Sequence, residues 1–109
     1  MAAIEDFMKL DIRIGTVIEA EFFPKAKVPA IIMKIDFGEV GIKQTSAQIT
    51  ERYLPEQLVG KQVVAVVNFP PRKIAGFTSE VLVLGGVPKN GDVVLLAPDM
   101  TLPNGTPIA

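Results

Sequence analysis

Two cationic side chains beside apolar and aromatic residues give this 109-residue sequence its clearest capacity for chemistry. Residues 68–79 read NFPPRKIAGFTS, so Arg72 and Lys73 directly follow a double proline. Because proline fixes φ and donates no backbone hydrogen bond, the pair should end a strand and stiffen the loop after it. Together with Ile74 and Phe77, the two cations could hold a phosphate or stack a base. A solvated loop with buried apolar anchors is the alternative interpretation.

The sequence offers few residues that could catalyse a reaction. It contains no Cys and no His, which excludes disulfides, zinc fingers and a Ser-His-Asp triad. The one adjacent pair of a nucleophile and a base is Ser79 and Glu80, and neighbours in a strand point to opposite faces. We therefore expect a binding module with no catalytic residue, no metal site and no cofactor.

Charge limits the kind of partner. There are 11 Lys and Arg against 12 Asp and Glu, a net charge of -1, which argues against a strong, purely electrostatic nucleic-acid binder. A near-neutral chain can still carry one positive face. Lys34 and Lys43 fall on neighbouring predicted strands and are candidates for that face.

Hydrophobic alternation predicts the strands that position these residues. From Leu10 to Phe22 the even positions are mostly apolar and the odd ones mostly polar, which is typical of a half-buried strand. Gly15 lies near its middle and predicts a bulge or bend. Further strands are expected at about 30–37, 40–47, 62–69 and 79–84, and a last one at 93–97 follows an Asn-Gly hairpin turn at 89–92.

Two segments read as helix. Ile4, Phe7 and Met8 have helical spacing within residues 3–9. Thr50 could cap a helical turn at 50–54, and the segment after it, 55–58, could start another turn.

The pattern as a whole predicts an all-β fold, a five-stranded OB-type Greek-key barrel with a short N-terminal helix and a short helical turn between the third and fourth strands. We expect one domain over residues 1–109, with the helix at about 3–9, the barrel at about 10–97 and a proline-containing tail at 98–109. In such barrels the loop after the first strand borders the ligand face, so Lys25 and Lys27 could extend the basic patch.

The apolar content exceeds what a barrel of this size needs for its own core. The N-terminal helix face, both faces of residues 63–67 and one side of 82–84 are apolar. We expect a homodimer with Ile4, Phe7 and Met8 at the interface, the alternative being a helix that plugs its own barrel.

The start of the sequence carries acidic residues where a secretory signal would be basic, and no apolar run approaches the roughly 20 residues of a membrane span. The expected location is the cytosol, without a membrane span.

Three motifs resemble a known family. Residues 11–17 (DIRIGTV), residues 43–50 (KQTSAQIT), and residues 68–76 followed by Ser79 and Glu80 are similar to the tRNA-binding OB-domain family. That family includes the C-terminal domain of some methionyl-tRNA synthetases, the endothelial monocyte-activating polypeptide domain and a free-standing bacterial branch of export-related chaperones. The likeness covers about residues 6–109.

The resemblance implies an OB barrel, an N-terminal helix and a homodimer with the termini at the interface. It implies tRNA binding in the family at large and binding of unfolded or pre-export polypeptide in the chaperone branch. Where tRNA-binding members often continue with Gly-Met, this chain has Val81 and Leu82, which makes the site more apolar. The positions that match the family's loop-and-strand signature are Asn68, Pro71, Arg72, Lys73, Gly76 and Ser79.

Two functions remain as hypotheses. The first is a homodimeric, non-enzymatic, export-related chaperone that holds unfolded preproteins, with the export machinery as a further candidate partner. The second is a tRNA-binding module in which the cations contact phosphates and Phe77 or Phe69 stacks on a base. The expected apolar peptide pocket consists of Phe37, Phe69, Ile74, Phe77 and Leu82. The expected anion-binding rim consists of Lys25, Lys27, Lys43, Asn68, Arg72, Lys73 and Ser79.

Overall fold

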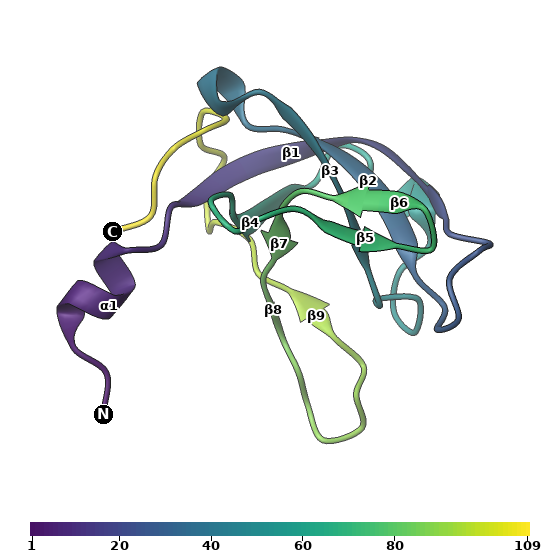
Figure 1. The fold of residues 1–109 in the computed structure, drawn as a ribbon. Helices are drawn as coiled ribbons and strands as arrows, with labels where there is room; N and C mark the ends of the chain where they lie inside the picture. Colours follow the sequence, from purple (N-terminus) through teal and green to yellow (C-terminus); the bar gives the residue numbers. More distant parts are fainter.

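The computed structural model describes all 109 residues and is built around one antiparallel sheet that curls into a nearly closed barrel (Figure 1). The sheet has five strands in the order β3-β2-β1-β4-β7. The prediction of an all-β, OB-like barrel with short helices is confirmed. The strands of this sheet are β1 (Ile12–Phe22), β2 (Ile31–Asp36), β3 (Ile42–Ala47), β4 (Gln62–Val66) and β7 (Leu82–Val83).

The first strand changes its inward face part-way along. Val17 pairs with Ile35 and Ala20 pairs with Met33, so both face the core across a register shift between Val17 and Glu19. The predicted alternation over the even positions is therefore wrong up to that shift, because Val17, an odd position, faces the core and Ile18 is 39% exposed. In a β-bulge, two residues of one strand lie opposite a single residue of its partner, so one residue, here Ile18, is left unpaired.

Gly15 does not form the bulge that the sequence predicts there. A Cβ at Gly15 would lie 2.6 Å from Ile35 Cγ2 and 2.6 Å from Phe37 Cδ1. The glycine is needed because two large core side chains pack directly against the backbone of β1.

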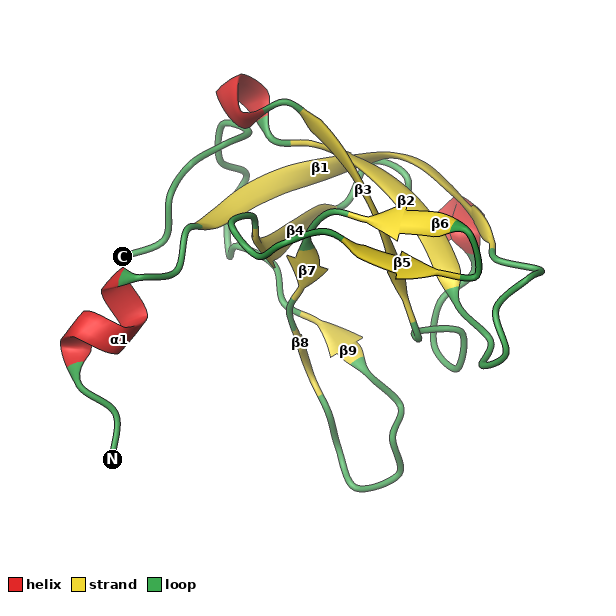
Figure 2. Cartoon of the chain, in the orientation of Figure 1, coloured by secondary structure: helices red, strands yellow, loops and turns green.

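The helices differ in how they meet the barrel (Figure 2). α1 (Ile4–Met8) buries no residue and projects away from the sheet. α2 (Pro55–Leu58) buries Pro55 and Leu58, and proline stands at its start, where a missing N–H costs nothing. The turn expected at 55–58 is this helix, whereas residues 50–54 form no helix. A 3-10 turn, η1 (Gly38–Val40), connects β2 to β3. None of the helices has the length and hydropathy that a membrane-spanning helix requires.

Two small hairpins complete the fold. β5 (Arg72–Ile74) pairs with β6 (Phe77–Ser79), although the sequence predicted a stiff loop here and a strand at 79–84. β8 (Gly85–Gly86) pairs with β9 (Val94–Leu95) on either side of the predicted Asn-Gly turn, in which Gly91 has φ +84°. The β8–β9 hairpin continues from β7, whereas the β5–β6 hairpin contacts β3 through β6 (Figure 1).

The C-terminal tail is partly paired with the barrel. Gly105 N donates to Ile14 O at 2.7 Å, and Thr106 O accepts from Ile14 N at 3.0 Å. Ile108 N donates to Ile12 O at 2.9 Å. The tail predicted to be irregular thus runs along the first half of β1, on the side opposite β4.

Candidate binding groove

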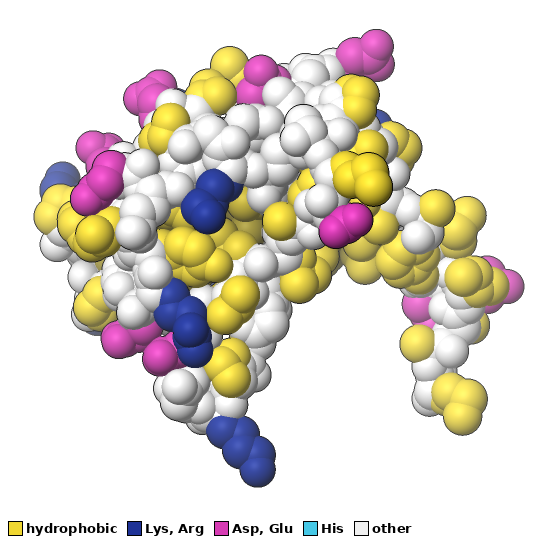
Figure 3. All heavy atoms as spheres, turned by 180° about the vertical axis from the view of Figure 1, so that it is seen from behind, with side chains coloured by type: hydrophobic (Ala, Val, Ile, Leu, Met, Phe, Trp, Pro, Cys, Tyr) yellow, Lys and Arg dark blue, Asp and Glu magenta, His cyan; other side chains and the backbone are white.

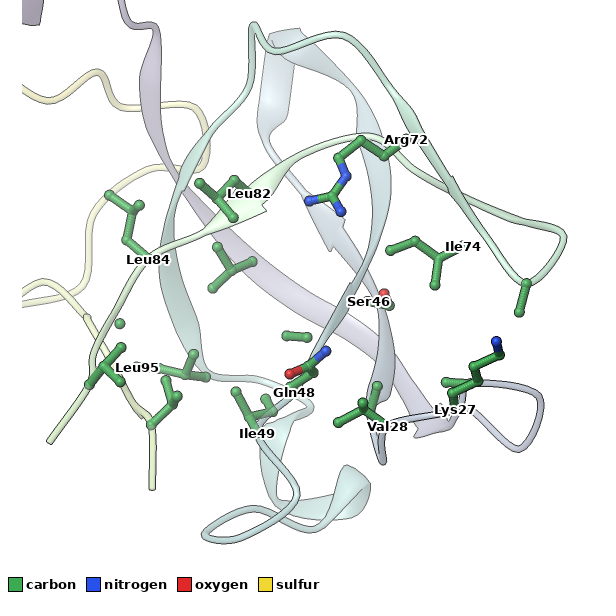
Figure 4. A pocket seen from close by; sticks show the side chains of 18 of the residues that line it. Lys27, Val28, Ser46, Gln48, Ile49, Arg72, Ile74, Leu82, Leu84 and Leu95 are labelled. Carbon is green, nitrogen blue, oxygen red and sulfur yellow. The ribbon is translucent and has the colours of Figure 1, made fainter. Parts of the chain in front are cut away.

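A groove of about 720 Å³ opens between the two ends of the five-stranded sheet (Figure 4). This volume is in the range of ligand-binding pockets, about 300–1,000 Å³. Thirteen of its nineteen lining residues are hydrophobic, so its walls would bind apolar groups. The lining residues are Lys25, Ala26, Lys27, Val28, Ala30, Ser46, Ala47, Gln48, Ile49, Arg72, Ile74, Ala75, Leu82, Val83, Leu84, Gly85, Val87, Val93 and Leu95.

The groove exists because β3 and β7 meet at one place and then separate. Thr45 Oγ1 donates to Val81 O at 2.8 Å and lies 3.0 Å from Ser79 Oγ. Past this contact β3 pairs only with β2, and β7 pairs only with β4. The barrel therefore stays open from Ser46 and Leu82 onward. The β1–β2 loop and the β5–β6 hairpin border the opening, where OB barrels bind their ligands.

The two sides of the groove differ in character. Figure 4 shows Arg72, Ile74 and Lys27 on one side and Leu84 and Leu95 on the other. Lys25 also lines the groove, and no Asp or Glu does. A ligand that pairs apolar groups with a negative charge would complement both sides.

Five residues predicted from the sequence come together in this groove. Lys25, Lys27 and Arg72 bring their positive charges to it, and Ile74 and Leu82 contribute apolar surface. They come from the β1–β2 loop, from β5 and from β7, so segments far apart in the sequence build one site.

The three predicted phenylalanines lie elsewhere. Phe37 is 0% exposed and belongs to the core, where it packs against Gly15. The prediction that Phe37 lines a peptide pocket is therefore wrong. Phe77 packs against Phe23 with ring centroids 5.5 Å apart. Phe69 is 43% exposed but does not line the groove.

Asn68 connects α1 to the barrel instead of facing the groove. Its Nδ2 donates to Lys9 O at 2.9 Å, and its Oδ1 accepts from Asp11 N at 2.9 Å. Arg13 Nε donates to Asp11 Oδ1 at 2.6 Å, and this hydrogen bond raises the pKa of Arg13. These polar contacts fix the chain where it enters β1.

The remaining predicted rim residues also lie outside the groove. Ser79 bonds to Thr45 at the contact between the sheet ends. Lys73 neighbours Arg72 on β5 but does not line the groove, and neither does Lys43. Glu80 Oε1 accepts from the N–H of a β3 residue at 3.0 Å, so Ser79 and Glu80 both serve the junction between strands.

Sequence reasoning missed the lining contributed by β3, β8 and β9. Ser46 on β3 and Gln48 directly after it line the groove, and Leu95 lies on the opposite side (Figure 4). The continuous apolar run at 93–97 was a signal, because a short terminal strand of this kind must cover some apolar surface. Which surface it covers depends on the separation of β3 and β7, which is not local in sequence.

Comparison with known proteins shows which family the sequence belongs to. A family model described as "Putative tRNA binding domain" matches residues 12–107. The chain is 40% identical over 106 residues to a methionine–tRNA ligase of Methanococcoides burtonii, covering 97% of this chain and 15% of that enzyme. It thus spans about 15% of the length of the curated relatives that it matches.

Two solved structures resemble the chain over its whole length. The chaperone CsaA of Bacillus anthracis is 69% identical, with a TM-score of 0.96, covering 100% of this chain and 99% of that one. The CsaA chaperone protein of Picrophilus torridus is 48% identical, with a TM-score of 0.93 and 100% of both chains covered. The chain belongs to the tRNA-binding-domain family, and its solved structural neighbours include CsaA chaperones.

Proposed function

We propose that the chain is a non-enzymatic chaperone module that holds unfolded or pre-export polypeptide in its groove, as a homodimer in the cytoplasm. One observation carries this proposal: the groove is walled by aliphatic side chains and three cations, and no aromatic residue lines it. Aliphatic walls suit the Leu, Ile and Val side chains that an unfolded chain exposes. The CsaA chaperones named above support the same class of function by similarity.

Holding requires no energy source in this mechanism. Each apolar side chain that enters the groove gains about 25 cal/mol for every Å² removed from water. Lys25, Lys27 and Arg72 attract acidic flanks of the polypeptide and speed the encounter. Release occurs when the polypeptide folds and buries the same side chains in its own core.

The N-terminal helix supports the homodimer. Ile4 is 69% exposed and Met8 is 73% exposed, so the apolar face of α1 has no cover within the chain. Figure 3 shows hydrophobic side chains on the helical arm that stands clear of the barrel. A second copy that covers this face would place two grooves on one particle, and their joint binding would raise the affinity for a long chain.

Binding of tRNA is the second candidate, favoured by the family model that matches residues 12–107. In this case Lys25, Lys27 and Arg72 would contact phosphates. Sequence-tolerant binding of single-stranded nucleic acid uses aromatic platforms for stacking. Because the groove lacks such a platform, we rank polypeptide first.

A titration at two salt concentrations separates the candidates. Reduced, carboxymethylated lactalbumin and unfractionated tRNA are each titrated against the protein at about 50 mM and 200 mM salt. A polypeptide site lined by apolar residues should keep its affinity for lactalbumin within about threefold, whereas phosphate contacts lose affinity steeply through counterion release. Tight, steeply salt-dependent binding of tRNA without any binding of lactalbumin would reverse the ranking.

A further inference from the structure

Along the outer edge of β3, some backbone N–H and C=O groups have no strong hydrogen-bond partner within the barrel. β3 ends the five-stranded sheet and pairs only with β2. At Gln44 the outer edge is satisfied, because Glu80 N donates to Gln44 O at 2.8 Å and Gln44 N donates to Glu80 Oε1 at 3.0 Å. Backbone groups of an edge strand face outward at every second residue, so Ser46 and Gln48 share the orientation of Gln44. Both line the groove.

The barrel offers only weak cover for this edge. Ser46 N lies 3.4 Å from Ser79 Oγ, a long hydrogen bond. Ala47 O, on the inward side of the edge, accepts from Ile49 N at 3.0 Å. β7, at the other end of the sheet, pairs with β4 instead of β3 and forms the opposite side of the groove. An exposed strand edge is a template for pairing with another extended chain.

The surroundings of the edge determine which side chains such a chain would carry. Ala47, Val83 and Leu95 line the groove and also pack against the core, so an added strand would meet apolar surface on its inward face. Arg72, which lines the groove from the β5–β6 hairpin, is exposed and positive. Successive side chains of a strand alternate between two faces.

We propose that the groove binds an extended segment that adds to the edge of β3 at Ser46 and Gln48, with apolar residues alternating with acidic ones. The inference rests on the proposed function and specifies its substrate class. An extended segment fits because it alone brings unpaired N–H and C=O groups to a strand edge, whereas a helix has satisfied its own. The acidic residues are inferred from three cations and no carboxylate in the lining.

The test uses a fluorescein-labelled eight-residue peptide that alternates leucine with glutamate. Two N-methylated versions remove backbone donors at the third and fifth positions or at the fourth and sixth. Because only alternate N–H groups face β3, one version should bind at least fivefold more weakly and the other within twofold of the parent. A version with lysine in place of glutamate should bind at least tenfold more weakly.

A pair of protein variants tests the same edge from the other side. Gln48→Pro removes the outward N–H of residue 48 and should weaken peptide binding at least fivefold. Gln48→Ala removes the side chain and keeps the backbone, so its affinity should stay within twofold. Circular dichroism melting checks that both variants fold, and the N-methylated peptides give the answer if Gln48→Pro does not.

The outcomes separate this inference from the proposed function. Equal effects of the two N-methylation patterns, or a preference for the lysine peptide, would overturn the added-strand mode, while binding of unfolded lactalbumin would leave the chaperone function standing. If neither lactalbumin nor the peptide binds, the proposed function fails together with the inference.

Discussion

At the scale of single residues, Gly15 shows how a missing side chain shapes the core. Replacing it with alanine places a Cβ 2.6 Å from Ile35 and Phe37, so the core must shift. Overpacking of this kind costs about 1–3 kcal/mol of the free energy of unfolding, which urea denaturation would measure. Gly86→Ala is the control, because its added Cβ would lie 3.9 Å from the nearest atom. Equal stability of the two variants would contradict the packing described here.

Arg72 and Lys73 form a second residue-scale comparison, since they are adjacent cations and only Arg72 lines the groove. Arg72→Glu should weaken binding of acidic unfolded polypeptide about tenfold, because it puts a like charge at the site. Lys73→Glu makes the same change in net charge and should alter binding less than threefold. Fluorescence titration at low salt measures both, and matching losses would show that only overall charge matters.

At the scale of elements, the β5–β6 hairpin turns through Ala75 and Gly76, with φ of +49° and +82°. Positive φ at both central residues is the pattern of a type I′ turn, in which asparagine is favoured and alanine is strained. Ala75→Asn should therefore stabilise the protein by about 0.5–1 kcal/mol, seen as a rise of a few degrees in Tm. A lower Tm for Ala75→Asn would contradict this interpretation of the turn.

The elements also show what the sequence could and could not predict. Apolar patterns predicted the positions of β1 to β4 correctly but not the inward face of β1, because a strand leaves a local trace whereas a register shift does not. The β5–β6 hairpin was missed, since the double proline suggests a loop and Ala75 is not a usual residue for its turn. Phe37 was expected in the peptide pocket, but Gly15, which is distant in the sequence, leaves space for its ring in the core. The groove itself depends on where β3 and β7 separate, a feature without local signature.

At the scale of the whole molecule, α1 has an apolar face that one copy of the chain leaves uncovered. If a second copy covers it, Met8→Glu should place a charge in the interface and shift the protein from dimer to monomer at micromolar concentration. Sedimentation velocity measures the mass directly. Glu5→Gln, on the same helix, should stay dimeric. A parent protein that sediments as a monomer would exclude the homodimer.

The most direct test of polypeptide holding compares two similar side chains, one inside the groove and one outside. Leu82 is 47% exposed and lines the groove, while Phe69 is 43% exposed and does not. Titration of reduced, carboxymethylated lactalbumin against Leu82→Asp and Phe69→Asp isolates the contribution of the groove. We predict at least a tenfold loss of affinity for Leu82→Asp and less than a twofold change for Phe69→Asp. Unchanged binding by Leu82→Asp, or an equal loss in both variants, would contradict the claim that polypeptide is held there.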